Sequence, residues 1–465
     1  MSVRRLLIAA SLACLASACA RSSAPSDAQG AEGFNFAGRG FGIDQQLAST
    51  SVSRNADGRF VIAWTESDTV QHADANAEVF EYAYLRLYSA QGEPLTDKIR
   101  VQDTGGQPYS VDAAIADDGS VLVTWAVRGD AGHVNDFNPI YARSYSAQGQ
   151  PLGGVSYLAQ VQDFNVAMPV AAARPGGGFL VAWQNYTENQ NLEYLGDRLI
   201  LRHDSAVSAR FLARDATPQG QVKTLVQLPT TLAGGPPETP ALAFAPDGSF
   251  VVVWQTATMI NNILNLQRFT REGDAIGATQ RVPPDRVTLS QSASIAMDGQ
   301  GAFVVAWYGG APGAGIGVGP EEPHNWFRRY TPDAQPLDPG TSIPTGADRP
   351  DRAGLDVCAG ADGRYVITWT VSQFQPGGDY VFAHYEPKKL GQFYTATGEP
   401  AGGVFPIECD PDSYQDNVSV TRATACDATG GFVSIWGNRR EVPTPIGSYY
   451  LYEGWARLFP APDTP

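Results

Sequence analysis

The chain has 465 residues, of which 43% are hydrophobic and 17% are charged, so it can bury a sizeable core and is not a disordered polymer. Its formal net charge is −16, which argues against nucleic acid or an anionic membrane surface as a partner, because both require concentrated Lys and Arg. The 49 glycines and 33 prolines suit a fold with many turns and few long helices.

The N-terminus has the composition of an export signal. Arg4 and Arg5 precede an apolar stretch at 6–16, which is too short to span a membrane as a mature helix. The sequence "LASAC" follows and ends at Cys19. It resembles the lipobox of bacterial lipoproteins, in which the cysteine is lipidated and becomes the new N-terminus.

The resemblance predicts a lipoprotein signal peptide over residues 1–18, lipid on Cys19 and a flexible tether over 19–37, rich in Ser, Ala and Gly. Ala20 follows the cysteine, where an aspartate would indicate retention in the inner membrane. The resemblance therefore implies an outer-membrane lipoprotein, in a leaflet that the sequence does not specify. Ordinary export to the periplasm or the medium, with cleavage after Ala18 or Ala20, is the alternative.

Few cysteines remain in the predicted mature chain beyond Cys19. Cys358, Cys409 and Cys426 are an odd number in an oxidising compartment, so one disulfide and one free thiol is an open possibility. No CxxC pair occurs, which disfavours zinc held by cysteines.

One phrase, "PDGSFVVVW" at 246–254, recurs through the rest of the chain. Each copy has a turn containing glycine, followed by a strand in which the residues on both faces are mostly apolar. This pattern indicates that both faces of the strand are buried. Seven tryptophans, 53 to 71 residues apart, end these strands: Trp64, Trp125, Trp183, Trp254, Trp307, Trp369 and Trp436.

Two further elements accompany each copy. A strand of small residues precedes the turn, as in "AAIA" at 113–116 and "VAAA" at 170–173, and small side chains suit an innermost strand crowded around an axis. After the tryptophan come a variable loop, a third strand such as "ARSYSAQGQP" at 142–151, and a fourth strand such as "KIRVQ" at 98–102.

Seven units of four short antiparallel strands predict an all-β, seven-bladed β-propeller over residues 38–465, because radial stacking covers both faces of every sheet. Tandem immunoglobulin-like sandwiches are the alternative, although they need nearer 100 residues per unit. The last unit ends after its third strand, so we expect an N-terminal strand at 42–47 to close the ring beside 455–459.

The phrase "G-x-F-V-V-x-W … R-F/Y-x-x-x-G" resembles repeats of large secreted bacterial proteins and lipoproteins that are predicted to be propellers. The resemblance covers about residues 40–465. Most of those proteins have no assigned activity, so it implies a fold and no catalytic residues.

Arginine recurs on the third strand, and repetition in every unit favours a structural role over an active site. A sialidase-like arginine cluster is a weaker interpretation, because these arginines lie away from the axis. The residues are Arg86, Arg143, Arg210, Arg268, Arg328 and Arg457, with Gln392 in the sixth unit.

All five histidines fall between a strand-ending tryptophan and the next third strand. In a propeller these loops open on one face, and variable loops on a rigid frame commonly bind ligands. The predicted ligand-binding face therefore contains Trp326 and the histidines His72, His133, His203, His324 and His384.

No HExxH, GxSxG, phosphate-binding glycine loop or EF-hand sequence occurs. We predict no metal and no cofactor, and the sequence leaves any catalytic residues unidentified. The sequence favours a monomeric, exported binding or scaffold propeller, anchored only by its lipid, that recognises a protein or glycan partner in the cell envelope. The alternative is a hydrolase or lyase acting on glycans through carboxylates in the central funnel, where the innermost strands carry Arg54, Asp112, Arg174, Asp356 and Arg422.

Replacing Cys19 with Ser tests the anchor. Without the thiol no lipid can be attached, and stable anchoring requires more than one acyl chain, so we expect the variant to leave the membrane fraction. Fractionation of wild-type and variant cells measures this. A wild-type protein that is already soluble would support ordinary export instead.

Overall fold

The computed structural model describes residues 33–35, 49–71, 77–102, 108–127, 137–162, 168–195, 198–228, 231–232, 239–257, 262–282, 291–309, 324–344, 349–350, 354–375, 384–408, 414–415, 419–444 and 447–462. Within these residues the secondary structure is entirely β. They contain no helix long and apolar enough to cross a membrane.

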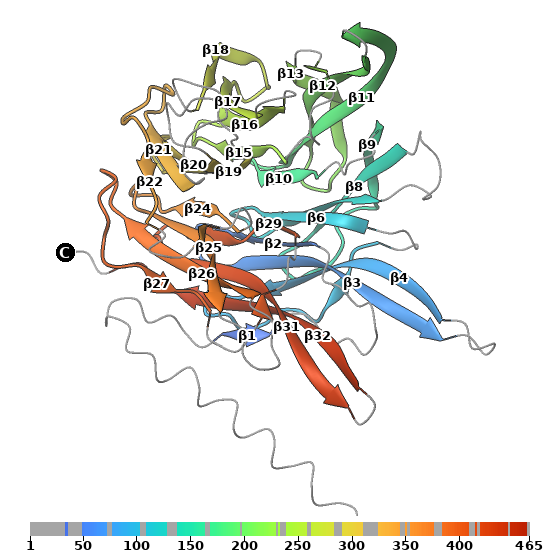
Figure 1. The fold of residues 1–465 in the computed structure, drawn as a ribbon, viewed down its shortest axis with the longest axis vertical. Coiled ribbons are helices and arrows are strands. Elements are labelled where there is room, and N and C mark those ends of the chain that lie inside the picture. Colours follow the sequence, from blue (N-terminus) through green and yellow to red (C-terminus); the bar gives the residue numbers. More distant parts are fainter. Residues whose placement is uncertain are drawn as a thin grey trace, which may run out of the picture.

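The strands form seven antiparallel sheets, and the colours in Figure 1 run once around the ring that these sheets build. The predicted seven-bladed propeller is confirmed. In every blade the first strand lies nearest the axis, and the chain then moves outward strand by strand.

The first three blades are regular in their strand order. Blade 1 consists of β2 (Ser49–Arg54), β3 (Phe60–Gln71), β4 (Ala77–Tyr88) and β5 (Ile99–Arg100). Blade 2 consists of β6 (Pro108–Ile115), β7 (Val121–Val127), β8 (Phe137–Tyr145) and β9 (Ser156–Gln162). Blade 3 consists of β10 (Val170–Ala173), β11 (Phe179–Leu195), β12 (Arg198–Leu212) and β13 (Pro218–Gln227), and β14 (Thr231–Leu232) also pairs with β12.

The same order continues in the next three blades. Blade 4 consists of β15 (Ala241–Phe244), β16 (Phe250–Ala257), β17 (Asn262–Phe269) and β18 (Ala275–Arg281). Blade 5 consists of β19 (Gln291–Met297), β20 (Phe303–Gly309), β21 (His324–Tyr330) and β22 (Thr341–Ser342). Blade 6 consists of β24 (Asp356–Ala359), β25 (Tyr365–Gln375), β26 (His384–Tyr394) and β27 (Phe405–Pro406), and β23 (Arg349–Pro350) also pairs with β25.

Blade 7 combines both ends of the chain. It consists of β30 (Thr424–Cys426), β31 (Phe432–Thr444), β32 (Gly447–Phe459) and β1 (Phe34–Asn35), with β28 (Tyr414–Gln415) on the edge of β31. The preceding strand β29 (Ser419–Arg422) pairs in parallel with β2 of blade 1, so the segment that leads into blade 7 is hydrogen-bonded to the innermost strand of blade 1.

An N-terminal strand closes the ring as predicted, but it is a different segment. β1 pairs with β32 through Phe34 opposite Ala456 and Asn35 opposite Trp455, whereas the predicted segment 42–47 lies outside the described residues. The sequence pattern missed β1 because a two-residue strand shows no alternation. Phe34 contributes through its ring, which lies 5.2 Å from that of Tyr88 and 6.4 Å from that of Phe60.

The core consists of seven hydrophobic clusters, each located between two neighbouring blades and each containing one of the seven repeated tryptophans. Blade 4 shows the division of the repeat: Phe250, Val252 and Trp254 pack towards blade 3, whereas Val251 and Val253 pack towards blade 5. The apolar character of both faces of the second strand therefore follows from its having a blade on either side.

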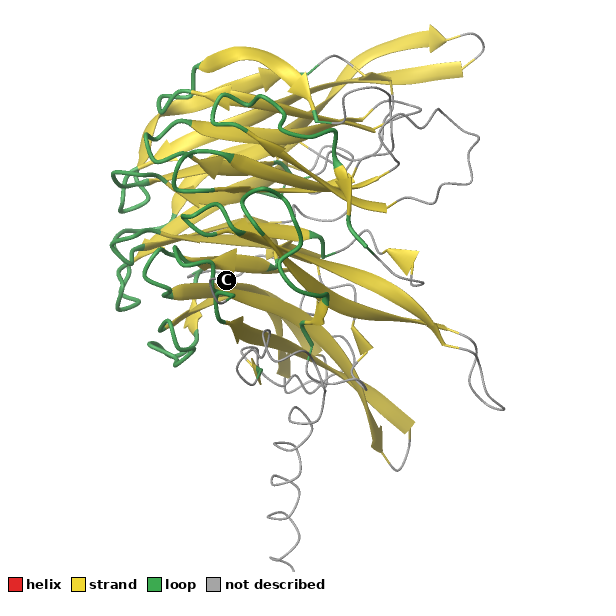
Figure 2. Cartoon of the chain, turned by 90° about the vertical axis from the view of Figure 1, so that its left-hand side faces the viewer, coloured by secondary structure: helices red, strands yellow, loops and turns green. Residues whose placement is uncertain are grey.

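The two faces of the ring differ. Figure 2 shows short turns on one face and long hairpins extending from the other. The turns contain glycines of positive φ, such as Gly58 at 85° and Gly248 at 86°, which other residues rarely adopt. In blade 5 the positive-φ glycine of the turn is Gly301 at 84°.

Truncating Phe34 tests the closure. We expect Phe34→Ala to lower the stability by about 2 kcal/mol, less than for a fully buried phenylalanine, because this ring is only partly buried. Thermal unfolding of the purified protein measures the effect, with Asn35→Ala, an exposed residue of the same strand, as the control. Equal midpoints for the two variants would show that β1 adds little to the ring.

Candidate functional site

The hairpins that join second and third strands form the face on which the sequence places ligand binding. The β11–β12 hairpin is the longest, with strands of 17 and 15 residues, and the β31–β32 hairpin has two strands of 13. The innermost strands are much shorter, so the hairpins continue beyond the ring as two-stranded arms (Figure 2).

The described histidines lie on these hairpins. His203 pairs with Glu188 in the β11–β12 arm, and His384 pairs with Gln375 where β26 begins. His324 begins β21 opposite Gly309. His72 and His133 lie outside the described residues.

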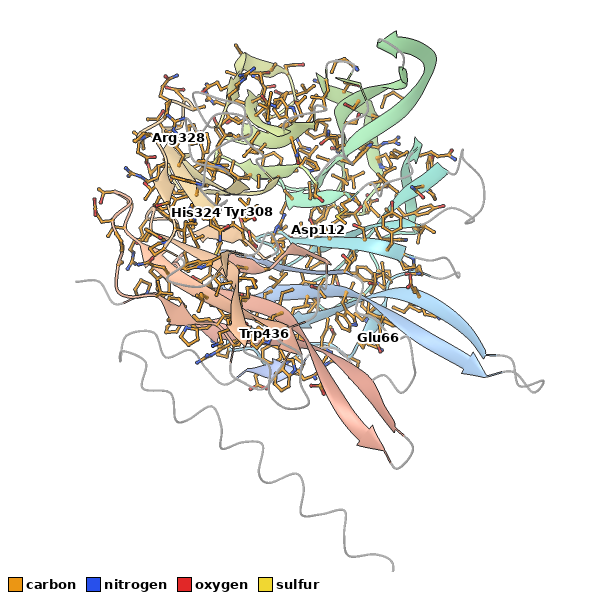
Figure 3. The ribbon with its side chains drawn as sticks, in the orientation of Figure 1. Glu66, Asp112, Tyr308, His324, Arg328 and Trp436 are labelled. Carbon is orange, nitrogen blue, oxygen red and sulfur yellow. A yellow bond between two sulfur atoms is a disulfide. The ribbon has the colours of Figure 1, made fainter. Side chains whose placement is uncertain are left out.

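Blade 5 gives the clearest local view of this face. His324 is partly exposed beside Tyr308 on the paired strand (Figure 3). Trp326 lies opposite Trp307, and its indole donates a hydrogen bond of 3.2 Å to the carbonyl of Gly309. Its ring is therefore held at the base of the β20–β21 hairpin.

Asp112 and Asp356, the two carboxylates that the sequence places on the innermost strands, act as bridges between blades. Asp112 is fully buried. It accepts hydrogen bonds from the hydroxyl of Ser51 in blade 1 and, at 2.8 Å, from the backbone N–H of Ala171 in blade 3. Figure 3 shows it close to the centre of the ring.

Asp356 repeats this arrangement in blade 6. The hydroxyl of Ser294 in blade 5 donates to one oxygen, and the backbone N–H groups of Ala423 and Thr424 donate to the other at 2.8 Å. Burial raises the pKa of Asp356, opposed by these hydrogen bonds and by the charges of Arg422 and Lys389. Each aspartate thus connects three successive blades through neutral donors.

The arginines of the innermost region also have partners in neighbouring blades. Arg54 forms a 2.9 Å salt bridge to Asp427 across the ring closure. Arg174 donates to the carbonyl of Arg271. The Arg422 side chain extends from β29 to the carbonyl of Ala171, at 3.1 Å, and lies 3.6 Å from Asp112.

A buried lysine, which sequence reasoning missed, lies between blades 6 and 7. Lys389 is only 3% exposed, and its ammonium group donates a 2.7 Å hydrogen bond to the carbonyl of Ile435. Burial lowers the pKa of Lys389 to about 8, against the opposing attraction of Asp356 and Glu408. The only sequence signal is a lysine at a strand position where the corresponding Ala83, Ile140, Val207 and Leu264 are apolar.

The third-strand arginines contact the preceding blade. Arg143, Arg210, Arg328 and Arg457 donate to the backbone carbonyls of Val101, Leu158, Val282 and Ile407 respectively. These contacts explain the repetition as packing between blades, as the sequence suggests.

Arg268 was wrongly aligned with this set. Gln267, opposite Val252, occupies the position of the repeated arginine, and Arg268 follows it opposite Val251. Its side chain consequently turns to the other face of the sheet, where it pairs with Asp333 of blade 5 at 3.1 Å. Adjacent polar residues at 267 and 268 made the alignment ambiguous by one position, and one position reverses the face in a strand.

The cysteine pairing that the sequence leaves open is resolved for two residues. Cys358 of β24 and Cys426 of β30 form a disulfide with Cα atoms 5.4 Å apart. It joins the innermost strands of blades 6 and 7. Cys409 lies outside the described residues.

The described residues contain no group of three or more His, Cys, Asp or Glu side chains able to hold a metal ion. On the described innermost strands, both carboxylates are buried and hydrogen-bonded to neighbouring blades. The polar groups there serve packing between blades.

No protein-family model and no curated protein matches the chain. Among solved structures, it is similar to a protein of unknown function from Dyadobacter fermentans, with 10% identity over 79% of this chain and 99% of that one and a TM-score of 0.41. An α-L-arabinanase from Penicillium chrysogenum is 12% identical over 73% and 92% of the two chains, with a TM-score of 0.40. An α-L-arabinofuranosidase from Fusarium graminearum is 12% identical over 75% and 92%, with a TM-score of 0.39. Likeness at this level carries no argument about activity.

Because Lys389 is buried, we expect the folding stability of the wild type and of the variant Lys389→Met to depend differently on pH. Below about pH 8 the lysine is protonated in both the folded and unfolded states. Between about pH 8 and its ordinary value of 10.5, only the unfolded chain keeps the proton. The stability of the wild type should therefore rise with pH across this window, relative to the variant, by about 3 kcal/mol.

Denaturant unfolding of both proteins at pH 7.5 and 10.5 measures this difference. Titrating tyrosines contribute equally to both proteins and cancel in the comparison. Parallel pH profiles would show that Lys389 titrates near its ordinary pKa.

Proposed function

We propose that the protein is a non-catalytic binding or scaffold propeller of the cell envelope, anchored by lipid at Cys19, that recognises a protein or glycan partner through its hairpin face. The observation that carries this proposal is the asymmetry of the ring. One face consists of short turns, and the other of two-stranded arms, up to 17 residues per strand, on a rigid frame. Binding residues concentrate on such extensions because they vary without disturbing the core.

The chemistry of the axis supports binding over hydrolysis. A glycosidase of the usual kind needs two carboxyl groups facing a shared substrate, about 5–10 Å apart. Asp112 and Asp356 are instead buried and hydrogen-bonded through both oxygens to donors from neighbouring blades. A glycan-acting hydrolase or lyase remains the alternative function, and it would need carboxylates other than these two.

The arms also offer strand edges. β23 pairs with Val371 and Ser372 of β25, and β28 pairs with Asn438 and Arg439 of β31. These are the second and third positions after the strand-ending tryptophans Trp369 and Trp436. The chain itself therefore shows that an extended segment can add to an arm at this level, which is how many proteins bind an extended peptide.

Shortening the longest arm tests the proposal. Replacing residues 189–202 by Asn-Gly leaves Glu188 and His203 joined by a two-residue turn at their observed pairing. We expect the thermal midpoint to stay within a few degrees, because the arm lies outside the core, while binding to the envelope fraction falls about tenfold. The double variant His72→Ala with His133→Ala should weaken binding without unfolding.

Residue-resolved crosslinking to the envelope fraction, together with a glycan array, identifies the face in contact. An exposed turn-face change, Asp57→Ala, is the matched control and should leave binding intact. Crosslinks confined to Asp57, Asp118 or Asp247 would reverse the choice of face. Turnover of a glycan, abolished by one carboxylate substitution, would replace the binding proposal by the enzymatic one.

A further inference from the structure

Four successive turns on the face opposite the arms, those of blades 5, 6, 7 and 1, are linked by backbone hydrogen bonds. The N–H of Gly299 in blade 5 donates to the carbonyl of Ala361 in blade 6, at 3.1 Å. Ala361 donates in turn to Ala428 in blade 7, at 2.9 Å, and Ala428 donates to Ala56 in blade 1, at 3.3 Å. One N–H per turn therefore joins four successive blades.

Blade 4 cannot extend this series. In the turn "PDGS", Pro246 holds the position of Ala361 in "ADGR", and proline has no N–H to donate to the turn of blade 5. A cavity of about 230 Å³ lies at this junction. It is lined by Ala245, Pro246, Asp247, Ser249, Phe250, Val251, Arg268, Met297, Gly299, Gln300, Gly301 and Pro332.

The walls of this cavity combine an apolar base with a few polar groups. Val251 and Met297, which pack between blades 4 and 5, belong to the strands beneath the turns. Arg268 and Asp247 carry opposite charges, and Gln300 and Ser249 add neutral hydrogen-bonding groups. A small number of polar groups over an apolar base is the usual composition of a small-molecule site.

Arg268 is available to a ligand. It departs from the repeat by one position, so it makes none of the contacts to a preceding blade that hold the repeated arginines. Its ion-pair partner, Asp333, is 83% exposed, and an ion pair with so exposed a carboxylate contributes little free energy. A ligand carboxylate can replace Asp333 at the guanidinium.

Asp247 supplies the opposite charge. One of its oxygens accepts hydrogen bonds from the backbone N–H and the hydroxyl of Ser249, at 2.8 and 2.6 Å. These bonds hold the pKa of Asp247 below its usual value. The carboxylate is therefore ionised at neutral pH, and both of these hydrogen bonds use the same oxygen, Oδ1.

We propose that the junction of blades 4 and 5 binds a small carboxylate that also carries a hydroxyl or ammonium group. The ligand carboxylate pairs with Arg268, its donor group meets Asp247, and Gln300 contributes its amide. The volume is below the roughly 300 Å³ at which drug-sized pockets begin, so the ligand has the size of one sugar or one amino acid. This site lies on the face opposite the arms and does not depend on the partner proposed for them.

Two sources supply this chemistry, an acidic sugar and an amino acid, and calorimetric titration of the full chain distinguishes them. The probes are D-galacturonate and L-serine. The two half-probes are D-galactose, which has hydroxyl groups but no carboxylate, and acetate, which has a carboxylate but no hydroxyl or ammonium group. Saturable binding of galacturonate or serine, stronger than that of both half-probes, supports the proposal and identifies the source. No saturable binding, or equal binding of all four, overturns it.

Two variants locate the site. Arg268→Gln should lower the affinity for the bound probe about tenfold or more, the effect of losing a charged hydrogen bond. Arg271→Gln is the matched control, because Arg271 is 58% exposed and its guanidinium lies 3.6 Å from the carboxylate of the neighbouring Glu272, and it should bind as the wild type does. Unchanged affinity in Arg268→Gln would overturn the proposal.

Pro246→Ala tests the origin of the cavity. Alanine already occupies the corresponding position in Ala56 and Ala361, so the turn can accept it, and its N–H can extend the backbone series to blade 5. We expect binding to weaken about tenfold while the thermal midpoint stays the same or rises. Full affinity together with a raised midpoint would show that the junction closes without affecting any ligand, which also overturns the proposal.

Discussion

A four-stranded blade with two apolar faces is stable only if a neighbour covers each face. In each blade of this protein the second strand is apolar on both faces, and its repeated tryptophan is buried against the preceding blade. No blade can therefore be terminal, because a terminal blade would expose one of these faces to water. Closure of the ring follows from this requirement, and it accounts for the pairing of β1 with β32, the parallel pairing of β29 with β2, and the salt bridge from Arg54 to Asp427.

The polar groups near the axis follow from the same constraint. Packed innermost strands leave some backbone N–H groups facing a neighbouring blade, where water is excluded and an unpaired donor is costly. Asp112 and Asp356 each satisfy such donors. A charged residue on an innermost strand is therefore weak evidence for catalysis in a propeller, because the same residue can be required to join three blades.

Much of the architecture could be predicted from the sequence because it is repeated. The seven tryptophans, the apolar second strands and the glycine turns each recur, so an error in one copy is corrected by the others. The features that occur once were harder to predict. Phe34 and Asn35 form a strand too short to show alternation, and the partners of Cys358 and Lys389 are separated from them in sequence, at Cys426 and Ile435. On the predicted ligand-binding face, the structure gives the side-chain positions of His324 and Trp326. Whether this face binds a ligand depends on the partner as well as on the chain, so neither sequence nor structure alone determines it.

The departures from the repeat are the places where this ring can acquire specificity. Similar short turns form this face in each blade, and backbone hydrogen bonds link those of blades 5, 6, 7 and 1. At blade 4, Pro246 removes one donor and Arg268 occupies the opposite face of its strand. Neither change affects the tryptophan cluster between blades 4 and 5, so the frame keeps its packing while one junction gains a cavity and an available guanidinium. A closed ring tolerates such changes because its stability comes from seven similar interfaces, and a polar change at the rim of one of them leaves the apolar contacts beneath intact.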